Sequence, residues 1–244
     1  KWKADGKIKH LGFSFHSSAK LLDRILTEHP EVEFVQIPFN YIDCESELVQ
    51  AMASYEVICK HGKLAVFMEP VKGGGLSKVP EAVEKKLKEL DPGASVASWA
   101  IRFAGSFEGA ICNLSGMSTL EQVKDNIKTV QTLEPLREAE KAALHEVVKL
   151  YKAAGPIGAD LSKYEGLTLH GAPVTGILEA YNMCQLQPDP GFADDNNYLK
   201  NTIAEEAHLD CFGELPEEKV ILADGTDATE EVLKTERWLI EHSF

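Results

Sequence analysis

Four short apolar runs alternate with amphipathic segments along residues 1–154, and this alternation constrains the fold more than any other feature. The apolar runs cover residues 10–16, 34–41, 64–71 and 110–114. Each run is short and nearly continuous in its apolar character, which is typical of parallel strands covered on both faces. The alternation therefore predicts an α/β fold of right-handed β/α units around a parallel sheet.

Four β/α units amount to half of a (β/α)8 TIM barrel. A small doubly wound sheet is the alternative, because it is built from the same units. A dinucleotide-binding sheet of that kind carries a G-x-G-x-x-G motif after its first strand, and residues 10–20 contain none. The half-barrel is therefore the favoured prediction.

The stretch 110–126 reads as a short buried strand, a tight turn and a capped helix. Ser118 is a suitable N-cap, and Glu121 three residues later would complete a capping box. A helix N-terminus after a strand offers free N–H groups and a positive dipole end, which favours an anion such as phosphate. An ordinary strand-to-helix turn is the alternative. The following apolar residues recur at helical spacing: Leu120, Val123, Ile127 and Val130.

The chain is acidic, with a formal net charge of -14 over 244 residues. That charge argues against nucleic acid and against an anionic membrane surface as partners. No apolar run approaches transmembrane length and no signal peptide is evident. The scattered cysteines show no C-x-x-C spacing, so no metal site is predicted and a reducing cytoplasm is the expected location. These are Cys44, Cys59, Cys112, Cys184 and Cys211.

Gly155 marks a change in composition, after which Gly, Pro and Asp become frequent. We therefore expect two parts, a half-barrel over residues 1–154 and a mostly helical C-terminal extension over residues 155–244. Helices are predicted at residues 175–186 and 229–242 within the extension. Because the chain begins at Lys1 and not at a methionine, we expect the native polypeptide to start upstream.

Four segments resemble, in order and spacing, the fifth to eighth barrel strands of the aldo/keto reductase family. They read DGKIKHLGFSFH, VQIPFNYID, VFMEPVKGGGLS and LSGMSTLEQVKDN. The resemblance covers residues 1–157, with a weaker echo at 177–186. It implies the C-terminal half of the barrel and an NADP(H)-dependent oxidoreductase acting on a carbonyl or alcohol substrate. The segments are most similar to the branch with a C-terminal iron–sulfur segment.

The resemblance also implies a cofactor site at the carboxyl ends of the strands. Ser14 and Gln36 would hold the nicotinamide carboxamide, and Met68 would lie near the nicotinamide ring. The loop 71–76 would pass along the pyrophosphate, with Val71, Gly73 and Leu76 as its marking residues. The 2′-phosphate and adenine end would be surrounded by Gly116, Ser118, Gln122 and Asn126.

Several departures from the family pattern limit these expectations. Phe15 stands where many relatives have an Asn, and Gln122 where many use an Arg, so NAD(H) is the alternative to NADP(H). The family's catalytic Asp, Tyr, Lys and His come from its first four strands, so no catalytic residue is assigned here. The cysteine-rich run of the branch is missing, and no iron–sulfur cluster is expected.

Two functions follow from this pattern. The first is the cofactor-binding half of an aldo/keto reductase, whose partner is the missing N-terminal half or another subunit. The alternative is a non-catalytic nucleotide-binding or scaffold subunit built on a half-barrel, whose open sheet edges would need to be covered. Near the predicted site, Glu69 could pair with Lys72 or touch the substrate, and a structural ion pair with Lys72 is the expectation.

Overall fold

A computed structural model of the chain describes residues 1–189, 191–192, 198–201 and 209–242. The chain divides into two compact units, Lys1–Val148 and Lys149–Phe244. The predicted division at residues 154 and 155 concerns domain organisation and stays a prediction. All of the predicted cofactor-site residues fall in the first unit.

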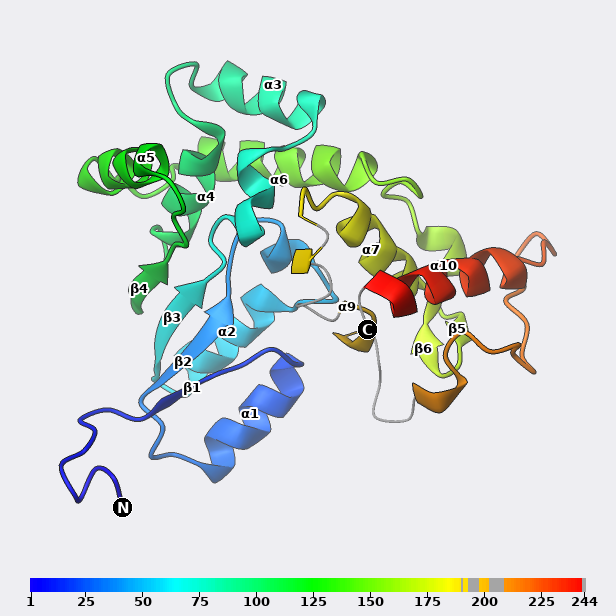
Figure 1. The fold of residues 1–244 in the computed structure, drawn as a ribbon, viewed down its shortest axis with the longest axis horizontal. Helices are drawn as coiled ribbons and strands as arrows, with labels where there is room; N and C mark the ends of the chain where they lie inside the picture. Colours follow the sequence, from blue (N-terminus) through cyan, green and yellow to red (C-terminus); the bar gives the residue numbers. More distant parts are fainter. Residues whose placement is uncertain (190, 193–197, 202–208, 243–244) are drawn as a thin grey trace. The chain divides into compact units, whose positions relative to one another are not determined.

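The first unit is built on a parallel sheet with the strand order β1-β2-β3-β4 (Figure 1). The predicted alternation of parallel strands and helices is confirmed. The strands are β1 (Gly12–Ser14), β2 (Phe34–Pro38), β3 (Leu64–Met68) and β4 (Ala110–Leu114). The helices between and after them are α1 (Ala19–Glu28), α2 (Ala51–Lys60), α3 (Glu81–Leu90), α4 (Val96–Ala104), α5 (Leu120–Gln131) and α6 (Glu138–Ala153).

Helix α2 begins later than its apolar spacing predicts. The helical pattern starts at Leu48, but the side-chain oxygen of Ser46 accepts hydrogen bonds from the N–H groups of Leu48 and Val49 at 3.2 and 3.3 Å. Gln50 then adopts a left-handed conformation with φ of 54°. The chain therefore turns before it can enter the helix, because local side-chain bonds compete with helical ones.

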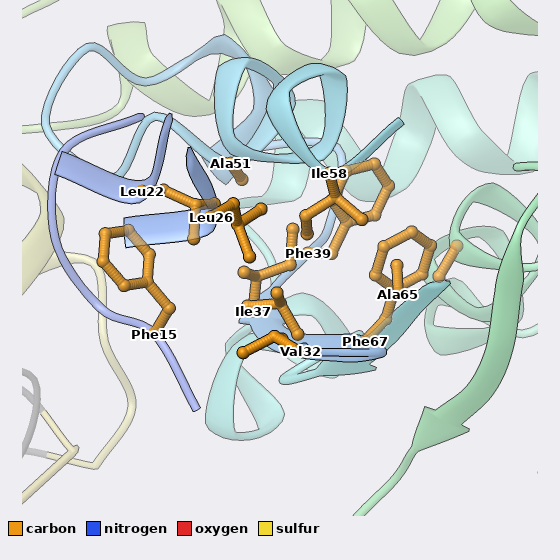
Figure 2. Packing of buried hydrophobic residues seen from close by; sticks show 12 residues of the cluster. Phe15, Leu22, Leu26, Val32, Ile37, Phe39, Ala51, Ile58, Ala65 and Phe67 are labelled. Atoms are coloured by element: carbon orange, nitrogen blue, oxygen red, sulfur yellow. The ribbon is translucent and has the colours of Figure 1, made fainter. Parts of the chain in front are cut away.

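The core of the first unit lies between the sheet and the helices that follow β1 and β2. Phe39 and Phe67 stack with their ring centroids 3.9 Å apart, and Leu22, Leu26 and Ile58 are buried in the same cluster (Figure 2). From the strands, the cluster takes Val35, Ile37, Ala65 and Phe67. Since side chains alternate along a strand, the residues between them belong to the other face of the sheet.

Strand β4 is exposed, although its apolar sequence predicts a buried strand. Ile111, Cys112 and Leu114 are exposed, so the prediction of a buried strand at this position is wrong. The reason is topological: within the described residues β4 is an edge strand that pairs with β3 alone.

Helix α5 shows the same exposure. Its predicted apolar positions form a helix face, but Leu120, Ile127 and Val130 are 62%, 50% and 58% exposed. The buried residue of this helix is Thr129. The apolar face of α5 therefore points away from the core of the first unit.

The second unit is mostly helical. Its helices α7 (Val174–Gln185) and α10 (Thr229–His242) pack together, and Tyr181 meets Trp238 edge-to-face at 5.0 Å. The buried Glu236 carboxylate accepts a hydrogen bond from the N–H of Gly213 at 2.7 Å and lies 2.9 Å from Nδ1 of His170. Smaller elements are η3 (Ser162–Tyr164), β5 (Thr168–Leu169), β6 (Ala172–Pro173), α9 (Tyr198–Asn201) and η4 (Leu209–Cys211).

No helix in the described part of the chain combines the length and the apolar character that crossing a membrane requires.

Candidate cofactor site

The sheet face opposite the core carries the strand residues predicted to contact a nicotinamide. Ser14 pairs in register with Gln36, and Met68 pairs with Pro38 on one side and with Leu114 on the other. Strand alternation puts these side chains on one face, at the carboxyl ends of neighbouring parallel strands. Ser14 is exposed, while Gln36 and Met68 are half-buried.

Gln36 and Met68 are in direct contact. The Nε2 group of Gln36 donates to the Met68 sulfur at 3.4 Å, which orients the amide toward β3. Phe15, which stands at a position where many relatives have an Asn, is buried in the core and meets Phe13 edge-to-face. Its side chain is therefore apolar and turned inward, and it adds no polar group to this face.

The loop after β3 has an unusual backbone. Lys72, Gly73 and Gly74 follow one another with positive φ values of 49°, 57° and 93°. Glycine adopts such angles at little cost, whereas lysine does so only when its surroundings hold it there. The loop includes η2 (Lys72–Ser77), in which Gly73 is exposed and Leu76 is fully buried.

A buried ion pair anchors this loop. Nζ of Lys72 lies 2.5 Å from Oδ1 of Asp43, and both side chains are only 1% exposed. The other carboxylate oxygen of Asp43 accepts from Asn40 Nδ2 at 2.6 Å, and the same nitrogen donates to the carbonyl of Glu69 at 3.1 Å. The expected ion pair between Lys72 and Glu69 is therefore wrong, because the Lys72 ammonium group forms its salt bridge with Asp43.

Glu69 lies at the junction of β3 and the loop, with a left-handed φ of 54°. Burial and, to a smaller extent, the nearby Asp43 carboxylate raise the pKa of its carboxyl group to about 7, against the opposing effect of Lys72. The carboxyl group therefore changes its charge near neutral pH. The raised pKa of Glu69 could not be predicted from the sequence, because it depends on burial and on a Lys72–Asp43 pair whose residues come from two distant segments.

The turn after β4 is capped one residue later than predicted. Thr119, not Ser118, is the N-cap, since its hydroxyl accepts the N–H of Gln122 at 3.2 Å. The Gln122 side chain accepts in return from the N–H groups of Thr119 and Ser118 at 3.1 and 2.7 Å. Both positions fit the S/T-x-x-E/Q pattern, so the sequence pattern could not distinguish between them.

The other residues predicted for the adenine end lie around this turn. Asn126 donates from Nδ2 to the Ser115 hydroxyl at 2.8 Å, which ties the first turns of α5 to the end of β4. Gly116, Ser118 and Gln122 are exposed. Because β4 is the neighbour of β3, this turn follows the strand next to the one that carries Met68.

A family model described as the aldo/keto reductase family matches residues 1–149, more than half of the chain. The chain belongs to the aldo/keto reductase family. A comparison with curated proteins found no match.

Solved aldo-keto reductases are similar to part of the chain. The holo form of AKR11C1 from Bacillus halodurans is 20% identical, with a TM-score of 0.49, and the match covers 60% of this chain and 52% of that one. Glycerol dehydrogenase AKR11B4 from Gluconobacter oxydans is 20% identical, with a TM-score of 0.48 and coverages of 62% and 52%. An aldo-keto reductase from Klebsiella pneumoniae in complex with NADPH is 17% identical, with a TM-score of 0.46 and coverages of 62% and 50%. The chain thus spans about half the length of these proteins.

Gly116 provides a test of whether this aldo/keto reductase chain fits a dinucleotide. Its φ is not in the left-handed region, and an added Cβ would meet no protein atom within 4 Å among the described residues. Neither the backbone nor a protein neighbour therefore requires glycine here. The backbone at Gly116 is therefore accessible to a group that approaches it closely.

No group of three or more His, Cys, Asp or Glu side chains in the described part of the chain is arranged to hold a metal ion. None of the five cysteines, all of which lie in the described part of the chain, forms a disulfide; Cys184 is buried and Cys44 is half-buried. The polar groups of the candidate site are accordingly amides, hydroxyls and the Lys72–Asp43 pair.

The capping assignment predicts a difference between two neighbouring variants. Thr119→Ala should lower the free energy of unfolding by about 0.5–2 kcal/mol, because it removes the N-cap of α5. Ser118→Ala should change it by less than about 0.5 kcal/mol, as for an ordinary surface substitution. Urea unfolding of both variants, with Thr119→Ser as the conservative control, measures this. A larger loss for Ser118→Ala would contradict the assignment.

Proposed function

We propose that this chain is the cofactor-binding half of an NADP(H)-dependent aldo/keto reductase-like oxidoreductase. The observation that carries the proposal is the placement of Ser14, Gln36 and Met68 on one face of the sheet, while the exposed turn that holds Gly116 follows the neighbouring strand β4. When bound, NADP(H) supplies or accepts the hydride in the interconversion of a carbonyl and an alcohol. We infer a half-barrel architecture for the first unit and a cytoplasmic location.

The residues of this face would divide the binding of the dinucleotide among them. Ser14 and Gln36 would orient the nicotinamide carboxamide by hydrogen bonds, and Met68 would pack against the ring. The loop that would follow the pyrophosphate contains Val71, Gly73 and Leu76. Gly73 is exposed, so its backbone is the part of the loop most accessible to the cofactor. The loop backbone is held in one conformation by the buried Lys72–Asp43 pair, so little ordering would be needed on binding.

The adenine end would be bound at the turn after β4. Ser118 and Asn126 would contribute polar contacts, and Gln122 would donate from Nε2 because its Oε1 atom already accepts two backbone N–H groups. Many relatives place an Arg at this position, which can bind a phosphate bidentately, whereas Gln is neutral. NADP(H) is the first choice of cofactor, and NAD(H) is the alternative.

Gly116→Ala tests the cofactor proposal directly. The added methyl group should occupy space that the dinucleotide needs and weaken NADPH binding about tenfold or more, as overpacking typically costs 1–3 kcal/mol. The melting temperature should stay unchanged, because no protein atom lies near the added group.

Gly93→Ala is the matched control, since Gly93 also lacks a left-handed φ and lies in an exposed loop between α3 and α4. NADPH fluorescence titration measures both variants and the parent. Equal affinity in Gly116→Ala and in the parent would contradict the placement of the cofactor. A parent chain that leaves NADPH fluorescence unchanged at high protein concentration would contradict cofactor binding itself.

We propose that β4 and α5 contact the partner that completes the sheet, either the N-terminal half of a longer chain or another subunit. The support is the edge of β4, which pairs with no further strand among the described residues, and the exposed apolar side chains Leu114, Leu120 and Ile127. Unpaired edges and apolar patches are normally covered. The same observation favours the second candidate function, a non-catalytic nucleotide-binding or scaffold subunit.

Light scattering of the full chain tests this surface. If the partner is a second copy of this chain, the chain without substitutions should self-associate as its concentration rises. Ile127→Glu should shift the population toward monomer, because it places a charge on the apolar face. Lys128→Glu, an exposed neighbour on the same helix, is the control. If the chain without substitutions stays monomeric at every concentration, this result would contradict self-pairing and leave an upstream half or a different subunit as the partner.

A further inference from the structure

Glu69 occupies a position between the two parts of the proposed cofactor site. It follows Met68 directly and precedes the loop 71–76. Its backbone carbonyl accepts hydrogen bonds from Asn40 Nδ2 at 3.1 Å and from the N–H of Lys72 at 2.9 Å. These bonds hold the backbone of Glu69 in its left-handed conformation, and its side chain is half-buried.

The charges around Glu69 do not balance when it is ionised. Lys72 is the cation beside it, but that ammonium group lies 2.5 Å from the Asp43 carboxylate, with both side chains buried. The neighbouring Cys44 adds no further negative charge, since burial raises its thiol pKa well above the usual value and keeps it protonated. Burial, then Asp43, raise the pKa of Glu69 to about 7, against the opposing effect of Lys72. Among the residues that the structure describes, an ionised Glu69 therefore shares Lys72 with Asp43, and the two carboxylates carry one negative charge more than this lysine offsets.

We propose that Glu69 sets the charge of the cofactor site, so that the anionic dinucleotide binds with uptake of a proton by this carboxyl group. The inference rests on the proposed function, because the ligand is NADP(H) at that site. An ionised carboxylate repels the pyrophosphate that would lie along the adjoining loop, whereas the neutral carboxyl group does not. A ligand that prefers the protonated state binds more weakly as the pH rises and that state is depopulated.

The test is the pH dependence of NADPH affinity in the full chain, measured by fluorescence titration between pH 6 and pH 8. For the parent, the affinity should fall by up to about tenfold over this range, as the protonated fraction falls through a pKa of about 7. Glu69→Gln should bind with less than about a twofold change over the same range, and at pH 8 it should bind more tightly than the parent. Glu56→Gln, which removes an exposed carboxylate from α2, should follow the parent.

A second measurement does not depend on the folding of the variant. Calorimetry of the parent at pH 7, in two buffers with different ionisation enthalpies, should report proton uptake when NADPH binds. NADH, which lacks the titrating 2′-phosphate, should give the same sign. A parent affinity that is independent of pH, binding without proton uptake, or a Glu69→Gln variant with the parent's pH dependence would overturn the role of Glu69 and leave the cofactor proposal standing. Absence of NADPH binding by the parent at every pH would overturn the proposed function and this inference with it.

Discussion

The ion pair between Lys72 and Asp43 is the interaction on which the rest of the candidate site depends. Two charged side chains, each 1% exposed, are placed where water cannot solvate them. Such burial is tolerated only when each charged atom has a close partner, and losing one partner typically costs several kcal/mol. Asn40 completes the arrangement by bonding both Asp43 and the Glu69 carbonyl. The end of β2 is thereby tied to the loop after β3, and the left-handed backbone of that loop follows from the tie.

The second organising feature is the division of the sheet into two chemically different faces. Val35, Ile37 and Phe67 face the core, while Gln36 and Met68 alternate with them on the opposite face. A single alternation along each strand therefore builds the core and the candidate site at once. The edge of the sheet at β4 is where this arrangement is incomplete, because that strand and α5 expose apolar side chains in the described part of the chain.

Much of this arrangement could be predicted from the sequence, because its signals are local. The strand–helix alternation, the Ser18 cap of α1 and the ordered family motifs each lie within a few residues of the structure they specify. The failures have two causes. Ser118 and Thr119 both satisfy one capping pattern, so only the backbone geometry decides between them. The Lys72–Asp43 pair joins residues 29 positions apart, and the exposure of β4 depends on what lies beside it. No local pattern encodes either.

The central claim is that one open face of the sheet binds a nicotinamide dinucleotide. Mapping of backbone amide resonances in the full 15N-labelled chain during titration with NADPH tests it most directly. The account predicts saturable shifts at Ser14, Gln36 and Met68, together with shifts at Gly116 and Asn126 in the turn after β4. The amide resonances of core-facing residues, such as Val35 and Phe67, should shift less than those of the site residues. Shifts confined to other parts of the chain, or no saturable shift at all, would contradict the account.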